Sequence, residues 1–173
     1  MRRLMLLRHA KSDWPATVAD LDRPLAARGR TEATAVGGFM VRAGLRPDLA
    51  LVSPARRARE TWTLLAAAFA ELPPQQADPR LYMATAEGLL DFVRTVHDVA
   101  TLLIVGHNPG LGEFARMSVG QGDPSARKRL AAAFPTAALA VIDFAADDWT
   151  ELLPQEGTLI HFVAPRSLGA RQD

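Results

Sequence analysis

The sequence predicts an α/β protein, namely a three-layer α/β/α sandwich whose central sheet is mainly parallel and contains an antiparallel strand. Two observations indicate this fold class. Short apolar runs alternate with amphipathic helical segments, which is the order of βαβ units. Near the end of the chain, β-type segments follow one another, so that a hairpin should supply the antiparallel strand. We expect a single domain over residues 1–173, a typical length for one hydrophobic core.

The first half of the chain alternates strand and helix. The apolar run 2–9 predicts a buried strand, and the helical spacing of apolar residues within 25–44 predicts a helix. Residues 47–53 predict a second strand. Ser53 and Pro54 then resemble a helix start, with serine as the N-cap and proline in the first turn, before a proline-rich segment ends the helix.

The middle of the chain continues this alternation. We expect a short strand at 80–83 and a helix over 86–97. Residues 101–107 give the clearest strand signal, because five apolar or β-branched residues precede a glycine. Asn108 and Pro109 repeat the pattern of cap and proline, which predicts another helix start.

The last third of the chain is predicted to be mostly strand. The polar stretch 120–136 resembles a loop within the domain. Segments 137–144, 149–153 and 158–165 have the composition of strands, and the turn-like residues 145–148 predict a hairpin between the first two.

Composition excludes several classes of protein. A net charge of +1 gives no field that would attract nucleic acid or an anionic membrane. The chain has no cysteine, which excludes a disulfide scaffold, a thiolate nucleophile and a cysteine-ligated zinc. No stretch approaches the roughly 18 apolar residues of a membrane span. We therefore expect a cytoplasmic monomer that binds neither nucleic acid nor membranes.

Polar side chains follow three of the predicted strands at the point where each strand ends. Arg8 and His9 end the first strand, Arg57 lies one turn into the helix after the second, and His107 ends the strand at 101–107. In an open α/β sheet, ligands bind outside the carboxyl ends of the strands. Helix N-termini favour anions there, and arginines bind phosphate oxygens through paired N–H donors. The sequence thus predicts a phosphate site.

Each of these residues also has a simpler interpretation. A single buried histidine such as His9 is more often a hydrogen-bonded core residue, and Arg57 could be solvated like its helix neighbours. The combination of two histidines with two arginines at one edge favours catalysis. A neutral imidazole attacks phosphorus well, and arginines neutralise the oxygens of the transferred group.

The motifs resemble those of a known family. The sequence is similar to the histidine phosphatase superfamily, with Ala10 where many members have glycine, and in particular to its phosphohistidine phosphatase (SixA-like) branch. The resemblance rests on LLRHAKSDW (6–14), DLDRPLAARG (20–29), SPARRARET (53–61), LYMATAEGLL (81–90), VGHNPG (105–110) and PTAALAVIDF (135–144).

The resemblance implies a phosphoglycerate mutase-like fold and specific roles. His9 would be the nucleophile, Arg8 and Arg57 phosphate ligands, and His107 a phosphate ligand on the second face. Arg23 would reach the same site as a substrate-binding residue. No metal and no cofactor are implied. The expected function is a metal-independent phosphatase that hydrolyses phosphohistidine in a protein through a phosphohistidine enzyme intermediate.

The proton donor is left open. Larger members of the superfamily carry a glutamate after the third strand, but no acid is adjacent to Tyr82 in this chain. Glu87, Asp20 and Asp22 are candidates for the proton donor. The alternative is that the protein supplies no proton donor. Because a phosphoramidate nitrogen is basic, a weak or absent acid fits phosphohistidine better than an alkyl phosphate.

Other functions are compatible with the same residues. A phosphatase of small phosphate esters is the alternative within the family, and a non-catalytic phosphate-binding module is one outside it. A metal hydrolase built on His9, His107 and His161 is disfavoured by the neighbouring arginines. The sequence leaves open whether the pocket is also lined by Lys11, Ser12, Trp14 and Asn108.

Overall fold

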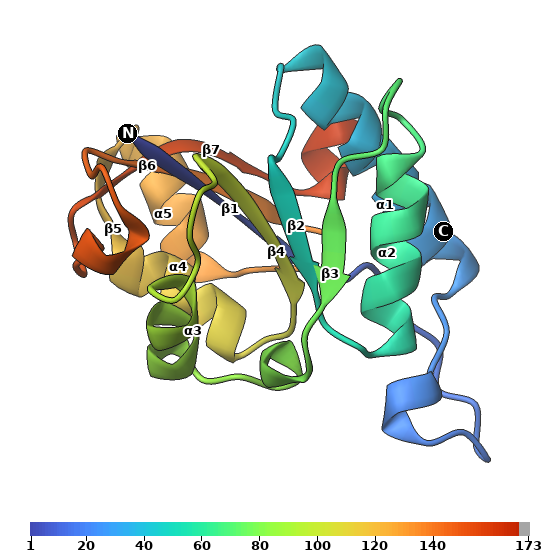
Figure 1. The fold of residues 1–173 in the computed structure, drawn as a ribbon. Coiled ribbons are helices and arrows are strands. Elements are labelled where there is room, and N and C mark those ends of the chain that lie inside the picture. The colour runs from blue at the N-terminus through green and yellow to red at the C-terminus, as the bar shows by residue number, and fades with distance from the viewer. Residues whose placement is uncertain (170–173) are drawn as a thin grey trace.

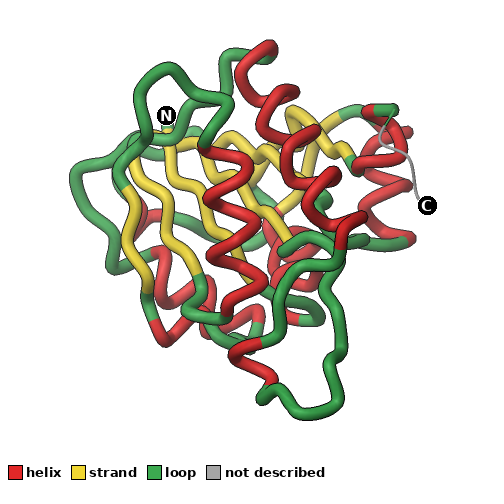
Figure 2. The backbone as a smooth tube through the Cα atoms, turned by 90° about the vertical axis from the view of Figure 1, so that its right-hand side faces the viewer, coloured by secondary structure: helices red, strands yellow, loops and turns green. Residues whose placement is uncertain are grey.

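The computed structural model describes residues 1–169, and its strands form one seven-stranded mixed sheet with helices on both faces (Figures 1 and 2). The predicted α/β sandwich is thereby confirmed. The last four residues of the expected domain 1–173 lie outside the described residues. In chain order, with 3-10 helices labelled η, the elements are β1 Arg2–Arg8, η1 Asp20–Asp22, α1 Ala27–Arg42, β2 Leu49–Val52, α2 Arg56–Ala66, β3 Gln75–Ala77, η2 Pro79–Leu81, α3 Ala86–Val93, β4 Thr101–Gly106, α4 Gly110–Ser118, β5 Val119–Gly122, α5 Pro124–Ala132, β6 Leu139–Phe144, η3 Trp149–Glu151, β7 Gly157–Val163 and η4 Pro165–Leu168.

The strand order of the sheet is β3-β2-β4-β1-β6-β7-β5. β6 runs antiparallel to both of its neighbours, and the other pairs are parallel. β2, β4 and β1 are therefore parallel neighbours in the middle of the sheet. The residues that follow them, Ser53, His107 and His9, must meet at one edge.

The alternating side chains of β1 divide the core into two layers. Leu4 and Leu6 pack on the face covered by α3, α4 and α5, whereas Met5 and Leu7 pack on the face covered by α1 and α2 (Figure 1). All four side chains are fully buried, and each contributes roughly 1.5–3 kcal/mol of transfer free energy. Within residues 1–169, no helix is long and apolar enough to cross a bilayer.

The segment between β1 and α1 projects from the lower right of Figure 1 and is anchored at its base. The Lys11 carbonyl accepts a hydrogen bond from the backbone N–H of Ala26 at 2.9 Å. Gly29 in the first turn of α1 packs so closely on Lys11 that any Cβ would overlap the same carbonyl oxygen. This contact requires glycine and fixes the chain immediately after His9.

The strand expected at 80–83 is wrong, because η2 occupies this part of the chain. The Asp78 carboxylate accepts from the Arg80 backbone N–H at 2.9 Å, and Pro79 fits the first position of the turn. The strand of this region is instead β3, in the preceding proline-rich segment, where it pairs with β2 at the edge of the sheet.

The loop expected at 120–136 is also wrong, since β5 and α5 lie within it. The Asp123 carboxylate caps α5 by accepting from the Ala126 N–H at 2.9 Å, and Pro124 occupies the first turn. The aspartate and proline form a helix-start signal, but the surrounding glycines and charges are typical of a loop.

The second β-type segment, 149–153, forms η3 instead of a strand. Asp148 caps this turn through the Thr150 N–H at 2.9 Å. The Trp149 indole is buried and donates to the Val99 carbonyl at 2.7 Å. A longer connection over 145–156 therefore replaces the predicted tight hairpin, although β6 and β7 still pair antiparallel.

Candidate active site

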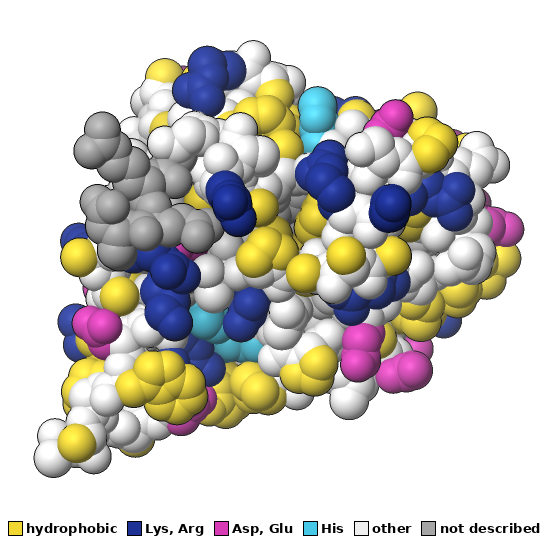
Figure 3. Space-filling model, turned by 180° about the vertical axis from the view of Figure 1, so that it is seen from behind, with side chains coloured by type: hydrophobic (Ala, Val, Ile, Leu, Met, Phe, Trp, Pro, Cys, Tyr) yellow, Lys and Arg dark blue, Asp and Glu magenta, His cyan; other side chains and the backbone are white. Residues whose placement is uncertain are grey.

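The five residues predicted for the site line one hollow of about 380 Å³ beyond the carboxyl ends of β1, β2 and β4. Histidine and basic side chains gather in this hollow at the lower left of Figure 3. Each of these five side chains comes from the end of an element. Arg8, His9 and His107 lie where strands end, Arg57 lies in the first turn of α2, and Arg23 follows η1. The lining consists of Arg8, His9, Lys11, Ser12, Trp14, Asp20, Arg23, Arg57, Tyr82, Met83, His107, Asn108 and Thr136.

His9 is held as a neutral imidazole with a defined tautomer. Its Nδ1 lies 2.8 Å from the Ala10 carbonyl oxygen, and because a carbonyl can only accept, Nδ1 carries the proton. Nε2 is then the nitrogen with the free lone pair. Burial lowers the pKa of His9 to about 3, and the positive charges of Arg57 and Arg8 act in the same direction. The ring is therefore unprotonated at neutral pH.

His107 has the opposite tautomer. Arg57 Nη2 lies 3.4 Å from His107 Nδ1, and a guanidinium can only donate, so Nδ1 accepts and Nε2 bears the proton. Nε2 then donates to Ser53 Oγ at 2.7 Å. Burial, followed by the charge of Arg57, lowers the pKa of His107 to about 4. Its ring centroid lies 5.2 Å from that of His9.

Ser53 does not cap α2, so this prediction is wrong. The helix begins at Arg56 after Ala55, whose N–H donates to Ser53 Oγ at 3.3 Å. The Ser53 side chain is fully buried and orients His107 from the neighbouring strand. Its role depends on the side-by-side position of β2 and β4.

Arg8 at the end of β1 and Arg57 in the first turn of α2 retain unused N–H donors. The buried Nε atoms of Arg8 and Arg57 have no hydrogen-bond partner among residues 1–169. Burial lowers the pKa of Arg8, which means that its surroundings disfavour the charged form. Donors of this kind are suited to an oxyanion.

The backbone that follows His9 is tied to α2 through Thr61. Its buried hydroxyl donates to the Arg57 carbonyl at 2.7 Å and accepts from the Ala10 N–H at 3.0 Å. Thr61 ends the sequence motif 53–61, and this contact gives a physical reason for a threonine at that spacing.

Asp20 is the one proton-donor candidate that lines the hollow; Asp22 and Glu87 are exposed and lie outside the lining. Its carboxylate accepts from Arg23 Nη1 at 2.9 Å, from Arg57 Nη2 at 3.0 Å and from the Tyr82 hydroxyl. The hydrogen bond from Tyr82, with those from the two arginines, holds the pKa of Asp20 far below its usual range.

The residues whose roles the sequence left open all line the hollow. The Ser12 hydroxyl accepts from Arg23 Nη2, and the Trp14 ring lies over the Arg23 guanidinium, 3.3 Å from its carbon to the ring centroid. Trp14 is therefore a wall of the pocket and does not cover the core. Asn108 also accepts from the Gly112 N–H in the first turn of α4, at 3.1 Å from its Oδ1, although the N-cap position expected for Asn108 is held by Pro109.

Tyr82 and Thr136 were not predicted as parts of the site. Tyr82 approaches His107 edge-on, with 5.5 Å between ring centroids. In the sequence, the segment around Tyr82 drew notice only for its lack of an adjacent acid, and nothing there indicated that the tyrosine lines the site. His161 packs against Phe39 instead, so the three histidines of the metal-hydrolase alternative do not come together. Within residues 1–169, no group of three or more potential metal-ligating side chains is present.

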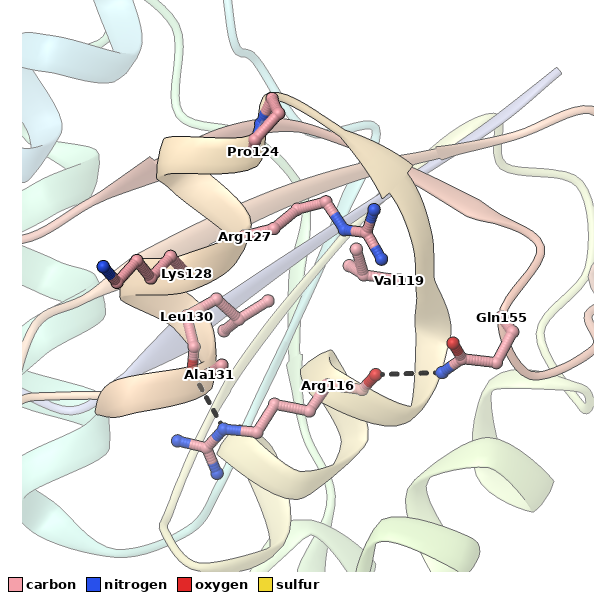
Figure 4. A pocket seen from close by; sticks show the side chains of 8 residues that line it. All are labelled: Arg116, Val119, Pro124, Arg127, Lys128, Leu130, Ala131 and Gln155. Carbon is pink, nitrogen blue, oxygen red and sulfur yellow. Dashed lines mark hydrogen bonds between the residues drawn. The ribbon is translucent and has the colours of Figure 1, made fainter.

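A second hollow of about 460 Å³ lies between α4, α5 and β5 (Figure 4). It contains three cations, but Arg116 Nε is engaged by the Leu130 carbonyl at 2.9 Å. The Arg127 and Lys128 side chains point in different directions (Figure 4), so these groups do not converge on one ligand. Histidine, arginine and aspartate side chains converge in the hollow that holds His9 and His107.

An α/β sheet with paired histidines and arginines at its carboxyl edge is the arrangement of an enzyme that handles phosphate groups. The family model of the histidine phosphatase superfamily (branch 1) matches residues 4–82. Uncharacterized protein Rv1276c of Mycobacterium tuberculosis is 39% identical over 164 residues, covering 92% of this chain and 100% of the relative.

Two solved structures of SixA proteins are also similar. The candidate phosphohistidine phosphatase SixA of Agrobacterium tumefaciens has a TM-score of 0.81 and 32% identity, covering 95% of this chain and 98% of that one. The corresponding protein of Nakamurella multipartitia has a TM-score of 0.80 and 29% identity, covering 95% and 96%. The chain belongs to the histidine phosphatase superfamily, in its SixA-like branch, and is a phosphatase.

Proposed function

We propose that this phosphatase hydrolyses phosphohistidine in a protein and that His9 carries the phosphoryl group during the reaction. The observation that supports this most strongly is the state of His9. The ring is neutral, its Nδ1 is fixed by the Ala10 carbonyl, and His9 lines the same hollow as the arginines. A nucleophile must be unprotonated before it attacks, and burial provides this at neutral pH.

The reaction would take two steps. His9 Nε2 attacks phosphorus while the bond from phosphorus to the substrate nitrogen breaks, and the substrate imidazole leaves with the proton that it already carries. Water then attacks the phosphoryl group on His9, whose bond to phosphorus breaks, so that inorganic phosphate and neutral His9 result. Arg8 and Arg57 would donate to the phosphoryl oxygens during both transfers, and His107 would do so through Nδ1 once the bound phosphoryl group, with its negative charge, favours protonation of that nitrogen.

The state of Asp20 supports a substrate with a basic leaving group. Its depressed pKa keeps the carboxylate ionised, and an ionised acid cannot protonate a leaving oxygen. A phosphoester would need such protonation, whereas the imidazole of phosphohistidine is basic enough to arrive protonated.

Phosphate release in EDTA tests the proposal, with wild type and His9→Ala compared on a phosphohistidine protein and on an activated aryl phosphate. Rapid release from the protein by wild type alone supports it. Cleavage of the aryl phosphate without release from the protein would move the substrate to small phosphate esters. Binding of phosphate without any turnover would favour the non-catalytic module.

A further inference from the structure

Two large hydrophobic side chains that line the active-site hollow are exposed, and a third exposed one is next in sequence to a lining residue. Trp14 is 76% exposed and Met83 is 52% exposed, and both line the hollow. Leu21 is 44% exposed and follows Asp20, another lining residue. Trp14, Leu21 and Met83 are called the apolar rim below. Hydrophobic side chains along the lower border of the hollow are visible in Figure 3.

The apolar rim is not explained by stability of the fold. Trp14 and Leu21 belong to the segment that projects beyond the sheet and helices in both Figure 1 and Figure 2, so their side chains do not help to cover the hydrophobic core. Met83 has a φ of 54°, a left-handed conformation that costs a residue with a side chain roughly 1–2 kcal/mol. Exposed apolar area and backbone strain together at one mouth are typical of a binding surface.

We infer that the apolar rim is the docking surface for the phosphohistidine protein, a folded partner whose phosphorylated side chain is surrounded by apolar residues. This inference rests on the proposed function. A protein that presents a phosphorylated side chain to the hollow would cover the exposed surface around it, whereas a small ester fits within about 380 Å³.

Charge and composition match this occupant. The hollow holds four cations, Arg8, Lys11, Arg23 and Arg57, against the carboxylate of Asp20, which suits a phosphoryl group at the centre of the interface. Around this charged centre, tryptophan and methionine are among the residues enriched where proteins meet, and tryptophan is often an energetic hot spot. Trp14 is also stacked on Arg23, so that the contact residue is already ordered.

The test compares two substrates with two variants. For a phosphohistidine protein and for free phosphohistidine, kcat/KM is measured with wild type, Trp14→Ala and Met83→Ser. The readout is the ratio of the two kcat/KM values, because Trp14 contacts Arg23 and its loss can change the rate on both substrates. Leu72→Ala is the matched control. Leu72 is 72% exposed, but it precedes β3 and thus lies towards the amino ends of the parallel strands, whereas the hollow lies beyond their carboxyl ends.

The docking surface predicts that the protein-to-small-substrate ratio falls by about tenfold or more in each rim variant and stays unchanged in Leu72→Ala. An unchanged ratio in Trp14→Ala and Met83→Ser would overturn the docking surface and leave the proposed function intact. An equal fall in Leu72→Ala would overturn it as well. If wild type itself released no phosphate from the protein, the proposed function would fail together with the docking surface.

Discussion

The Asp20 carboxylate lies 3.0 Å from Nη2 of Arg57, the arginine that we propose as a phosphate ligand. Arg23 donates to the other carboxylate oxygen at 2.9 Å. A carboxylate therefore occupies donors that an incoming phosphoryl group needs. Phosphate must displace this carboxylate or bind beside it, and Asp20 weakens the binding of free dianions in either case.

Replacing Asp20 by Asn should strengthen the binding of inorganic phosphate. Removal of one negative charge beside the two arginines is expected to lower the inhibition constant of phosphate by about tenfold, which corresponds to 1.4 kcal/mol. Because an ionised Asp20 cannot donate a proton, we expect kcat on phosphohistidine to fall by less than tenfold. Competitive inhibition kinetics measure both, with the exposed Asp22→Asn as control. A hundredfold loss of kcat would instead make Asp20 the general acid.

Arg57→Ala should lower kcat/KM by about 10²–10³, the usual effect of removing one donor to a transition-state oxyanion. Arg57→Lys should recover little of this loss, since an ammonium cannot reproduce the paired donors of a guanidinium. Arg56 precedes Arg57 on α2 but is half exposed, and its ion-pair partner among residues 1–169 is Glu60, at 3.4 Å. Steady-state kinetics should therefore show Arg56→Ala near wild type, and a comparable loss there would contradict the role of Arg57.

Ser53→Ala tests whether Ser53 positions His107. We expect kcat/KM to fall by about tenfold, as for the loss of one buried hydrogen bond, with partial rescue by Ser53→Thr. The ¹⁵N chemical shifts of His107 should also change, because its Nε2 proton loses its acceptor. Ser118→Ala replaces another buried serine, at the end of α4, and should leave those shifts unchanged. Unchanged His107 shifts in Ser53→Ala would refute the positioning role.

The lowered pKa of His9 predicts how stability depends on pH. Its value of about 3 lies below the ordinary 6.5, so the unfolded chain binds a proton in this window that the folded chain does not. Stability is therefore full above pH 6.5 and is lost as pH falls towards 3. His9→Asn should reduce the loss of unfolding free energy between pH 6.5 and pH 5 by about 2 kcal/mol at most. Urea titrations at both pH values measure it, and equal losses in the two proteins would contradict the lowered pKa.

The sequence predicted those parts of the fold and site that depend on local pattern. The continuous apolar runs of β1 and β4 identify central strands, and Arg8, His9 and His107 come directly after them. The carboxyl ends of parallel strands share an edge, so the meeting of these residues followed from the fold class. β5 and α5 were missed because glycines and charges outweighed a single helix-start signal.

Contacts between distant segments could not be predicted in this way. Ser53 and His107 are 54 residues apart, and their hydrogen bond exists because β2 and β4 are neighbours in the sheet. Asp20 and Tyr82 are 62 residues apart and meet only through two loops. Local pattern favoured a helix cap as the role of Ser53, whereas in the structure Ser53 binds His107. Local pattern also gave no reason to choose among Asp20, Asp22 and Glu87 as proton donor, whereas in the structure only Asp20 of these three lines the hollow.

The most direct test of the account is to trap the phosphoryl group on the enzyme. Wild type is mixed with a phosphohistidine protein that carries a labelled phosphoryl group, quenched in alkali and mapped by peptide analysis. The account predicts a transient, acid-labile label on His9 of the wild type. The label should be absent from His9→Ala, and in His107→Ala it should again be found on His9. Turnover without any labelled enzyme, or a label on His107, would contradict it.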